Sequence, residues 1–150
     1  MPSDVIMIPT ERILLHPTSS SKRALITEIV DLLPAMDPDP VLELIMARER
    51  LGSTGIGHGV AIPHSRMPDL EKPVIALARH TEGVDFDAID GQPVHIVVLL
   101  LVPDDDSCKH LELLAQLARQ LQHDSFRHAI MSAENEESIA ELFQLQASKP

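Results

Sequence analysis

Four of the six glycines of this 150-residue chain lie between residues 52 and 59, in a segment that ends on a histidine. The segment reads Gly52-Ser-Thr-Gly-Ile-Gly-His-Gly-Val-Ala-Ile-Pro-His64. It does not fit a nucleotide-binding loop, because the Walker pattern needs Gly-Lys-Ser/Thr and the dinucleotide pattern needs a strand before the glycines and a helix after them. Two interpretations stay open: a flexible connector, or backbone that must approach another group closely.

The histidine at the end of this segment, His64, directly follows Pro63 and a short apolar stretch, Val60 to Ile62. Proline fixes its own φ and restricts its neighbour, so this imidazole is presented from a stiff backbone. An exposed imidazole held in this way suits a nucleophile or a metal ligand. An ordinary surface histidine is the simpler interpretation from these residues alone.

A second histidine lies at helical spacing from apolar residues. His110 precedes Leu114, Leu117 and Leu121 at intervals of four, seven and eleven residues. This places it on the inner face of a helix over about residues 107–121, in the first turn. A helix start carries unpaired N–H groups and the positive end of the dipole, so an inward imidazole there could bind phosphate. A half-buried structural histidine explains the spacing equally well.

Other groupings do not support a metal site. The segment 85–91 imitates a calcium loop, but its third acid falls one position late and Ile96 stands where the loop needs Glu. His123 and His128 are five residues apart, a poor helical spacing for a shared metal. Cys108 is the single cysteine, which excludes a disulfide framework and a Cys-based metal site. None of these three groupings therefore indicates a metal site.

The elements that must position these residues alternate between helices and apolar strands. Residues 94–102 are apolar apart from His95, as in strands buried on both faces. Asp39 is the expected N-cap of a helix with Pro40 at its first position, and Gly52 its expected end. The alternation predicts an α/β layered domain. A first helix is expected to start at a cap among residues 19–21 and to run to about residue 33, and a third to start at a cap at 106 or 107 and to run to about 121. Further helices are expected over 40–51, from 124 and from 135, and strands over 60–62, 74–79 and 94–102.

Composition narrows the class of protein. Twelve Lys and Arg against twenty-three Asp and Glu give a net charge of −11. Such a surface repels phosphate backbones and anionic lipid, and suits a protein partner with a basic face. Without Trp or Tyr there is little to stack on a base or a sugar. The longest apolar run, 96–102, is too short to span a bilayer, and the N-terminus has no signal-peptide pattern. We expect a cytoplasmic single-domain protein over residues 1–150.

The segment from Gly52 to His64 resembles the phosphorylation-site motif of the mannitol/fructose-type enzyme IIA domain of the bacterial phosphoenolpyruvate-dependent phosphotransferase system. Residues 48–51, Arg-Glu-Arg-Leu, resemble the entry to that motif, while residues 86–93 and 103–121 resemble the nitrogen-regulatory branch. The similarity covers about residues 10–145. His58 stands where the family commonly has Asn, and Ser65 where it often has Gly.

The resemblance implies a three-layer α/β sandwich, with a mixed sheet flanked by helices on both faces. It implies that His64 accepts a phosphoryl group from a histidine phosphocarrier protein, that His110 stabilises this group, and that Arg48 helps shape the pocket. No metal or cofactor is implied. The phosphate-binding loop would comprise Ser53, Thr54, Gly55, Gly57, His58 and Gly59.

Three functions follow as alternatives. A nitrogen or metabolic regulator would change its binding to target proteins with its phosphorylation state. A sugar-transport enzyme IIA would pass the phosphoryl group to a permease IIB component. A pure binding module would have lost transfer, which the presence of both His64 and His110 argues against. The segment 86–93 and the absence of fused transporter domains favour the regulator.

Overall fold

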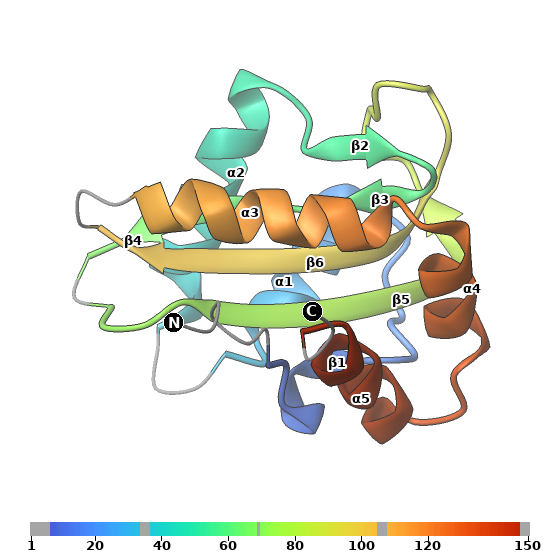
Figure 1. The fold of residues 1–150 in the computed structure, drawn as a ribbon. Coiled ribbons are helices and arrows are strands. Elements are labelled where there is room, and N and C mark those ends of the chain that lie inside the picture. Colours follow the sequence, from blue (N-terminus) through green and yellow to red (C-terminus); the bar gives the residue numbers. More distant parts are fainter. Residues whose placement is uncertain (1–6, 34–36, 69, 105–107, 148–150) are drawn as a thin grey trace.

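A computed structural model describes residues 7–33, 37–68, 70–104 and 108–147, and in it one six-stranded sheet lies between two layers of helices (Figure 1). The strands are β1 (Ile13–Leu14), β2 (Gly55–Gly57), β3 (Val60–Ala61), β4 (His64–Met67), β5 (Val74–Val84) and β6 (Val94–Pro103). The helices are α1 (Lys22–Val30), α2 (Pro38–Leu51), α3 (Cys108–Leu121), α4 (Asp124–Ser132) and α5 (Glu136–Ala147), and a short 3-10 helix covers Thr10–Arg12.

The sheet is mixed and has the order β1-β5-β6-β3-β2, and β4 pairs with residues 100–103 at the end of β6. Strands β5 and β6 run antiparallel, while β1 is parallel to β5 and both β3 and β4 are parallel to β6. This is the expected fold class. The strand expected over 94–102 is confirmed as β6, which lies in the middle of this order.

Alternate residues of β6 belong to two separate cores. Val98 and Leu100 pack with α3, α4 and α5, the layer that faces the viewer in Figure 1. Val97 and Leu99 pack with α1 and α2 behind the sheet. A strand covered on both faces buries both sets of side chains, which is why this segment shows no alternation of apolar and polar residues.

Helix α2 starts two residues earlier than the sequence suggests. Its N-cap is Asp37, whose carboxylate accepts a hydrogen bond from the Asp39 N–H, and Pro38 is the first helical residue. Two Asp-Pro pairs follow each other here, and both carry the signal for a helix start. The first pair prevails because Pro40 still falls in the first turn, where a missing N–H breaks no helical hydrogen bond.

The glycine segment forms a β-hairpin rather than a flexible connector. Strands β2 and β3 pair antiparallel, and the loop between Gly57 and Val60 has two residues, His58 and Gly59. Both have positive φ, 59° and 77°, as does Gly57 at 97°. Tight two-residue hairpins prefer loop residues with positive φ, so the glycines serve the turn.

A buried carboxylate ties this hairpin to the two helices behind the sheet. The side chain of Glu49, on α2, is only 2 % exposed, and its Oε1 lies 2.6 Å from Nζ of Lys22 on α1. The same carboxylate accepts hydrogen bonds from the backbone N–H and the hydroxyl of Thr54, at the entry to β2. Lys22 also donates to the carbonyl of Phe86, which accepts a second hydrogen bond from Ser53. Buried charges of this kind are tolerated because each is paired and hydrogen-bonded.

We predict that Glu49→Ala lowers the free energy of unfolding by about 3 kcal/mol, because it leaves the Lys22 ammonium in a mostly buried position without its partner. Urea denaturation measures the change. Glu43→Ala is the matched control on the same helix: its ion pair with Arg23 is exposed on both sides, so we expect a loss below about 1 kcal/mol. Equal losses in the two variants would contradict the role given to Glu49.

Candidate functional site

His64 is the first residue of β4, where it stands opposite Leu100 of β6. Its side chain is half-buried, and its Nδ1 lies 2.8 Å from the backbone oxygen of Ile62. A carbonyl oxygen can only accept, so Nδ1 must carry the proton of the neutral ring. The lone pair then resides on Nε2. The backbone therefore selects the tautomer in which Nε2 is the nucleophilic atom.

The Ile62 carbonyl is available because the edge of the sheet is interrupted there. Strand β3 ends at Ala61 and β4 begins at His64, so Ile62 and Pro63 lie between two short strands that pair with the same partner, β6. Ile62 donates its N–H to the Thr54 oxygen, which anchors it to the entry of β2. Its carbonyl oxygen turns to the His64 ring. The sequence predicted a stiff backbone before His64, but not this hydrogen bond.

His64 opens onto a cavity of about 340 Å³ that brings together several of the expected site residues. Arg48, Ser53 and Thr54 line it with His64. Helix α3 provides the opposite wall through Leu111, Leu114, Ala115 and Ala118, and Ile56 and Ile62 complete it. The cavity is thus mostly apolar, with one imidazole, one guanidinium and two hydroxyls. That is the lining expected where a few polar groups orient an anion and apolar walls exclude water.

Arg48 has a structural task as well as a place in this cavity. One terminal N–H donates to the Gly52 oxygen over 2.9 Å, at the carboxyl end of α2. A guanidinium has five N–H groups, so others remain for an anion. The same side chain therefore stabilises the end of α2 and supplies positive charge at the cavity.

The residues of the expected phosphate loop do not all meet at His64. Ser53 and Thr54 line its cavity, whereas His58 and Gly59 line a different one. Gly55 packs against Ala88, where a side chain would collide. The backbone N–H of His58 donates to Asp90, and the Gly59 oxygen accepts from two N–H groups of β6. The glycines thus shape the hairpin, and the hairpin positions Thr54 and Ile62 beside His64.

Asp90 anchors the hairpin turn to the loop that follows β5. Its carboxylate accepts backbone hydrogen bonds from Gln92 and from His58. The bond from Gln92 is the main cause that lowers the pKa of Asp90, and the N–H of His58 adds to it. An ionised Asp90 keeps both contacts across the neutral pH range.

The helix that carries His110 lies where the sequence placed it. Helix α3 spans Cys108–Leu121, and Leu117 and Leu121 of its expected inner face are buried. The backbone of His110 is in the first turn of this helix, but its side chain lies outside the described part of the structure, as do the candidate cap residues 106 and 107. The cavity is lined by residues of the same helix that follow His110, from Leu111 to Ala118.

Two exposed aliphatic side chains form an apolar rim on the cavity. Leu111, on α3, is 69 % exposed, and Ile56, on β2, is 39 % exposed, and both line the cavity. Exposed aliphatic residues gathered around a polar centre are typical of a protein docking surface.

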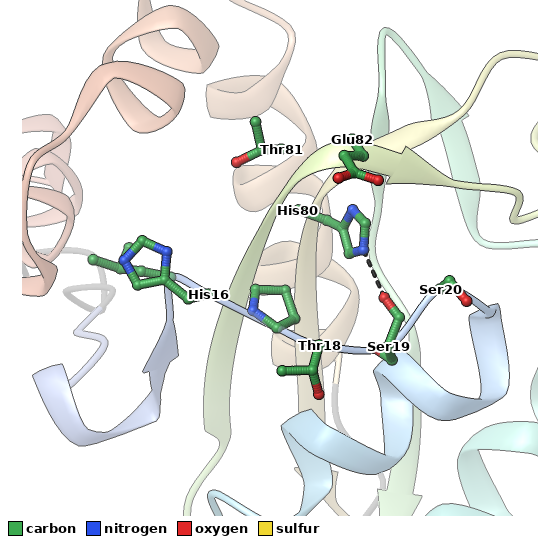
Figure 2. Close-up of a pocket in the computed structure, with 9 residues that line it drawn as sticks. His16, Thr18, Ser19, Ser20, His80, Thr81 and Glu82 are labelled. Carbon is green, nitrogen blue, oxygen red and sulfur yellow. Dashed lines mark hydrogen bonds between the residues drawn. The ribbon is translucent and has the colours of Figure 1, made fainter.

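Another cavity, shown in Figure 2, holds a histidine that is not free to react. Nε2 of His80 lies 2.7 Å from the Ser19 oxygen, and its Nδ1 accepts a hydrogen bond from the Gly83 N–H. Both ring nitrogens are therefore occupied by backbone groups. His80 fastens β5 to the segment before α1, and its role is structural.

The part of the chain that the structure describes offers neither a cluster of metal ligands nor a helix that could cross a membrane. Within residues 7–33, 37–68, 70–104 and 108–147, no three His, Cys, Asp or Glu side chains are arranged to hold a metal ion. Among the helices of those residues, none has the length and apolar character needed to cross a bilayer.

Sequence reasoning missed two features that position His64. Glu49 follows Val41 and Ile45 at intervals of four residues, so it lies with them on the buried face of α2. A carboxylate at such an apolar position indicates a buried ion pair, and the sequence therefore did contain a signal for the contact with Lys22. Strand β4 had no comparable signal, because Ser65 and Arg66 interrupt its apolar pattern.

Known proteins resemble this chain over most of its length. A sequence model of the family described as "Phosphoenolpyruvate-dependent sugar phosphotransferase system, EIIA 2" matches residues 6–145. A nitrogen regulatory protein of Pseudomonas aeruginosa is 38% identical over 135 residues, which cover 87% of this chain and 88% of that protein. A fructose-specific EIIA component of Haloferax volcanii is 33% identical over 138 residues, covering 89% and 90%.

Solved structures agree with this assignment. The nitrogen regulatory protein IIA-Ntr of Neisseria meningitidis superposes with a TM-score of 0.85 at 37% identity, covering 91% of this chain and 96% of that one. The mannitol IIA of Escherichia coli, at 19% identity, has the same fold with a TM-score of 0.77 over 92% of this chain and 99% of that one. The chain therefore belongs to the EIIA 2 family of the phosphoenolpyruvate-dependent sugar phosphotransferase system.

Proposed function

We propose that this protein accepts a phosphoryl group on Nε2 of His64 from a histidine phosphocarrier protein, in the cytoplasm, and acts as a nitrogen or metabolic regulator. The observation that carries the proposal is the hydrogen bond between Nδ1 of His64 and the Ile62 oxygen. It leaves the Nε2 lone pair free in the neutral ring, beside a cavity that also holds a guanidinium and two hydroxyls.

Phosphoryl transfer from the carrier to His64 needs neither a metal nor a cofactor. The Nε2 lone pair forms the new N–P bond as the N–P bond of the carrier breaks, and the departing imidazole keeps the electron pair of that bond. The proton on Nδ1 stays in place. The His64 ring gains positive charge in this step, and the Ile62 carbonyl stabilises it because a hydrogen bond strengthens when its donor is charged.

Arg48 is the group at the cavity that can act on the phosphoryl oxygens, because it supplies positive charge and N–H donors from the end of α2. Ser53 and Thr54 shape the cavity wall at the entry to β2, since their hydroxyls donate to Phe86 and Glu49. Thr54 is held by Glu49, so its position is fixed before the carrier binds. Phosphoryl transfer depends mainly on such positioning and on charge stabilisation. His110 would add a donor from the first turn of α3.

The regulatory role is supported by the relatives named nitrogen regulatory protein, which match this chain at 37–38% identity over most of its length. In such a role, phosphorylation at His64 would add charge in the middle of the apolar rim and so change which proteins dock there. The rim and the net charge of −11 suit a carrier or target with a basic, partly apolar face.

A transport role is the second candidate. The fructose-specific relative favours it, and so does the fold shared with a mannitol IIA that was solved in complex with its phosphorylated IIB. In that role, His64 would pass its phosphoryl group to a IIB component. Incubating the phosphorylated protein with a IIB component decides between the two roles, because rapid loss of the label from His64 to IIB is expected only of a transport protein.

We predict that His64 is the sole phosphoacceptor. His64→Ala should abolish labelling by phosphoenolpyruvate and the general phosphotransfer proteins, and the label on the parent protein should be labile in acid and stable in alkali. Mass-spectrometric site mapping gives the measurement, and His128→Gln, an exposed histidine on α4, is the control that keeps full labelling. Full labelling of His64→Ala would refute the assignment and direct attention to His58 or His110.

We predict that His110 orients and stabilises the phosphoryl group instead of accepting it. His110→Ala should slow transfer to His64 by about ten- to a thousandfold, the usual effect of losing one transition-state donor. His110→Asn or His110→Gln should restore part of the rate if an N–H donor is what matters. Thermal unfolding should stay unchanged, since a residue of the first helical turn has few packing obligations. If His110→Ala transferred at the wild-type rate, or lost activity only because it unfolded, His110 would have a structural role alone.

We predict that association with the carrier slows as salt is added, because the acidic surface steers a basic partner over a range set by the Debye length. Stopped-flow association rates at increasing salt provide the test. Leu111→Ser, within the apolar rim, should speed dissociation while leaving the salt dependence unchanged. An association rate indifferent to salt would remove the electrostatic part of the docking argument.

A further inference from the structure

A second cavity, of about 460 Å³, is lined by the turn of the β2–β3 hairpin. Strands β5 and β6 and helix α4 form its other walls. It is an open hollow at the surface, since His58 and His128 are exposed, and its volume is enough for a small molecule. The transfer mechanism at His64 uses none of its residues.

Basic side chains from three separate elements line this cavity. His58 comes from the hairpin turn, His95 from β6, and Arg127 and His128 from α4. Three of the eight histidines of an acidic chain are thus gathered at one place. The one carboxylate among the lining residues, Asp124, is paired with Arg127. The lining of this cavity therefore suits an anion.

Arg127 is fixed at one edge of the cavity. One of its terminal N–H groups donates to the Leu121 oxygen over 2.8 Å and another contacts Asp124, and its side chain is only 12 % exposed. Other N–H groups of the guanidinium remain for a ligand. Helix α4 begins beside it with no side-chain cap from His123, so the positive end of the helix adds to the favourable potential.

The side chain of His95 is held in place and forms one wall of this cavity. Its Nδ1 donates to the His80 oxygen over 3.0 Å, and its ring fills the space beside Gly83 and Gly59. A Cβ atom at Gly83 would lie 2.8 Å from the His95 ring, which is closer than Cβ atoms approach other heavy atoms in proteins. Ile96 and Met131 supply apolar surface next to this wall. A ligand with a charged head and an apolar body matches both parts of the lining.

The two cavities share one hairpin. Ser53, Thr54, Ile56 and Ile62 line the cavity of His64, and His58 and Gly59, from the turn of the same hairpin, line the second cavity. Ile62 also accepts the hydrogen bond that sets the His64 tautomer. A ligand that shifted the turn would therefore act on the segment that orients His64.

We propose that this second cavity binds a small organic anion, a carboxylate or a phosphate carried on an apolar body, and that its occupancy changes the rate at which His64 is phosphorylated. Binding of the anion does not depend on the proposed function, whereas its effect on the phosphorylation rate does. The site would make the phosphorylation state of the protein sensitive to the concentration of a metabolite.

Binding is tested on the full chain by NMR, through the imidazole signals of His58, His95 and His128. Hexanoate and hexyl phosphate distinguish the two head groups, inorganic phosphate tests the head alone, and hexanol tests the body alone. We expect saturable shifts with at least one of the two amphiphilic anions, and weaker or no shifts with phosphate or hexanol. The double variant His58→Gly/His128→Ala should bind about tenfold or more weakly, because each substitution removes an imidazole N–H that would donate to the charged head group. Glycine fits the positive φ of 59° at position 58. His16→Gln, an exposed histidine outside this cavity, is the matched control and should bind as the parent does.

No saturable shift with either amphiphilic anion, or equal affinity in the parent and the double variant, would overturn the site. The effect on rate is tested by labelling His64 with and without the anion at saturation, and we expect a severalfold change that the double variant loses. Binding without a change in rate would overturn the effector role and leave the site in place. Absence of labelling even without the anion would overturn the proposed function and the effector role with it, while the NMR result would still decide whether the cavity binds.

Discussion

The buried carboxylate of Glu49 is the contact on which the arrangement around His64 depends. It joins α1 through Lys22, α2 through its own backbone, and the glycine hairpin through Thr54. Thr54 in turn accepts from the Ile62 N–H, and Ile62 accepts from the His64 ring. A charged group in a buried position cannot shift without losing a partner, so each link in this series is held firmly. The orientation of the imidazole thus depends on Glu49, which contacts it only through Thr54 and Ile62.

The two-sided sheet explains why so large a part of the fold could be predicted from the sequence. Residues 94–102 carry an unbroken apolar pattern because both faces of β6 are covered, and α3 shows its apolar face at regular spacing because only one side is. Signals for helix ends were also local, as with Ser21, which caps α1 through its hydroxyl. Where two equivalent Asp-Pro signals followed each other, the sequence could not choose between them and the start of α2 was misplaced.

The candidate site was harder to predict, since its geometry comes from contacts between distant segments. His64 could be recognised by its motif, but the partner of its Nδ1 depends on a break in the sheet edge that no spacing reveals. The glycines suggested a loop around phosphate, yet they form a hairpin whose turn belongs to another cavity. His58 illustrates the limit: it is six residues from His64 in sequence, and the pairing of β2 with β3 turns it away from that site.

The interruption between β3 and β4 has a further consequence for the behaviour of the chain in solution. Strand β4 pairs with β6 on one side, and no other strand covers its second side among the residues that the structure describes. Uncovered strand edges can recruit a strand from another molecule and so begin aggregation. Here that edge is only four residues long, is preceded by Pro63, which offers no N–H, and carries the charge of exposed Arg66. The break that frees a carbonyl for His64 thus also makes this side of the sheet a poor template for intermolecular pairing.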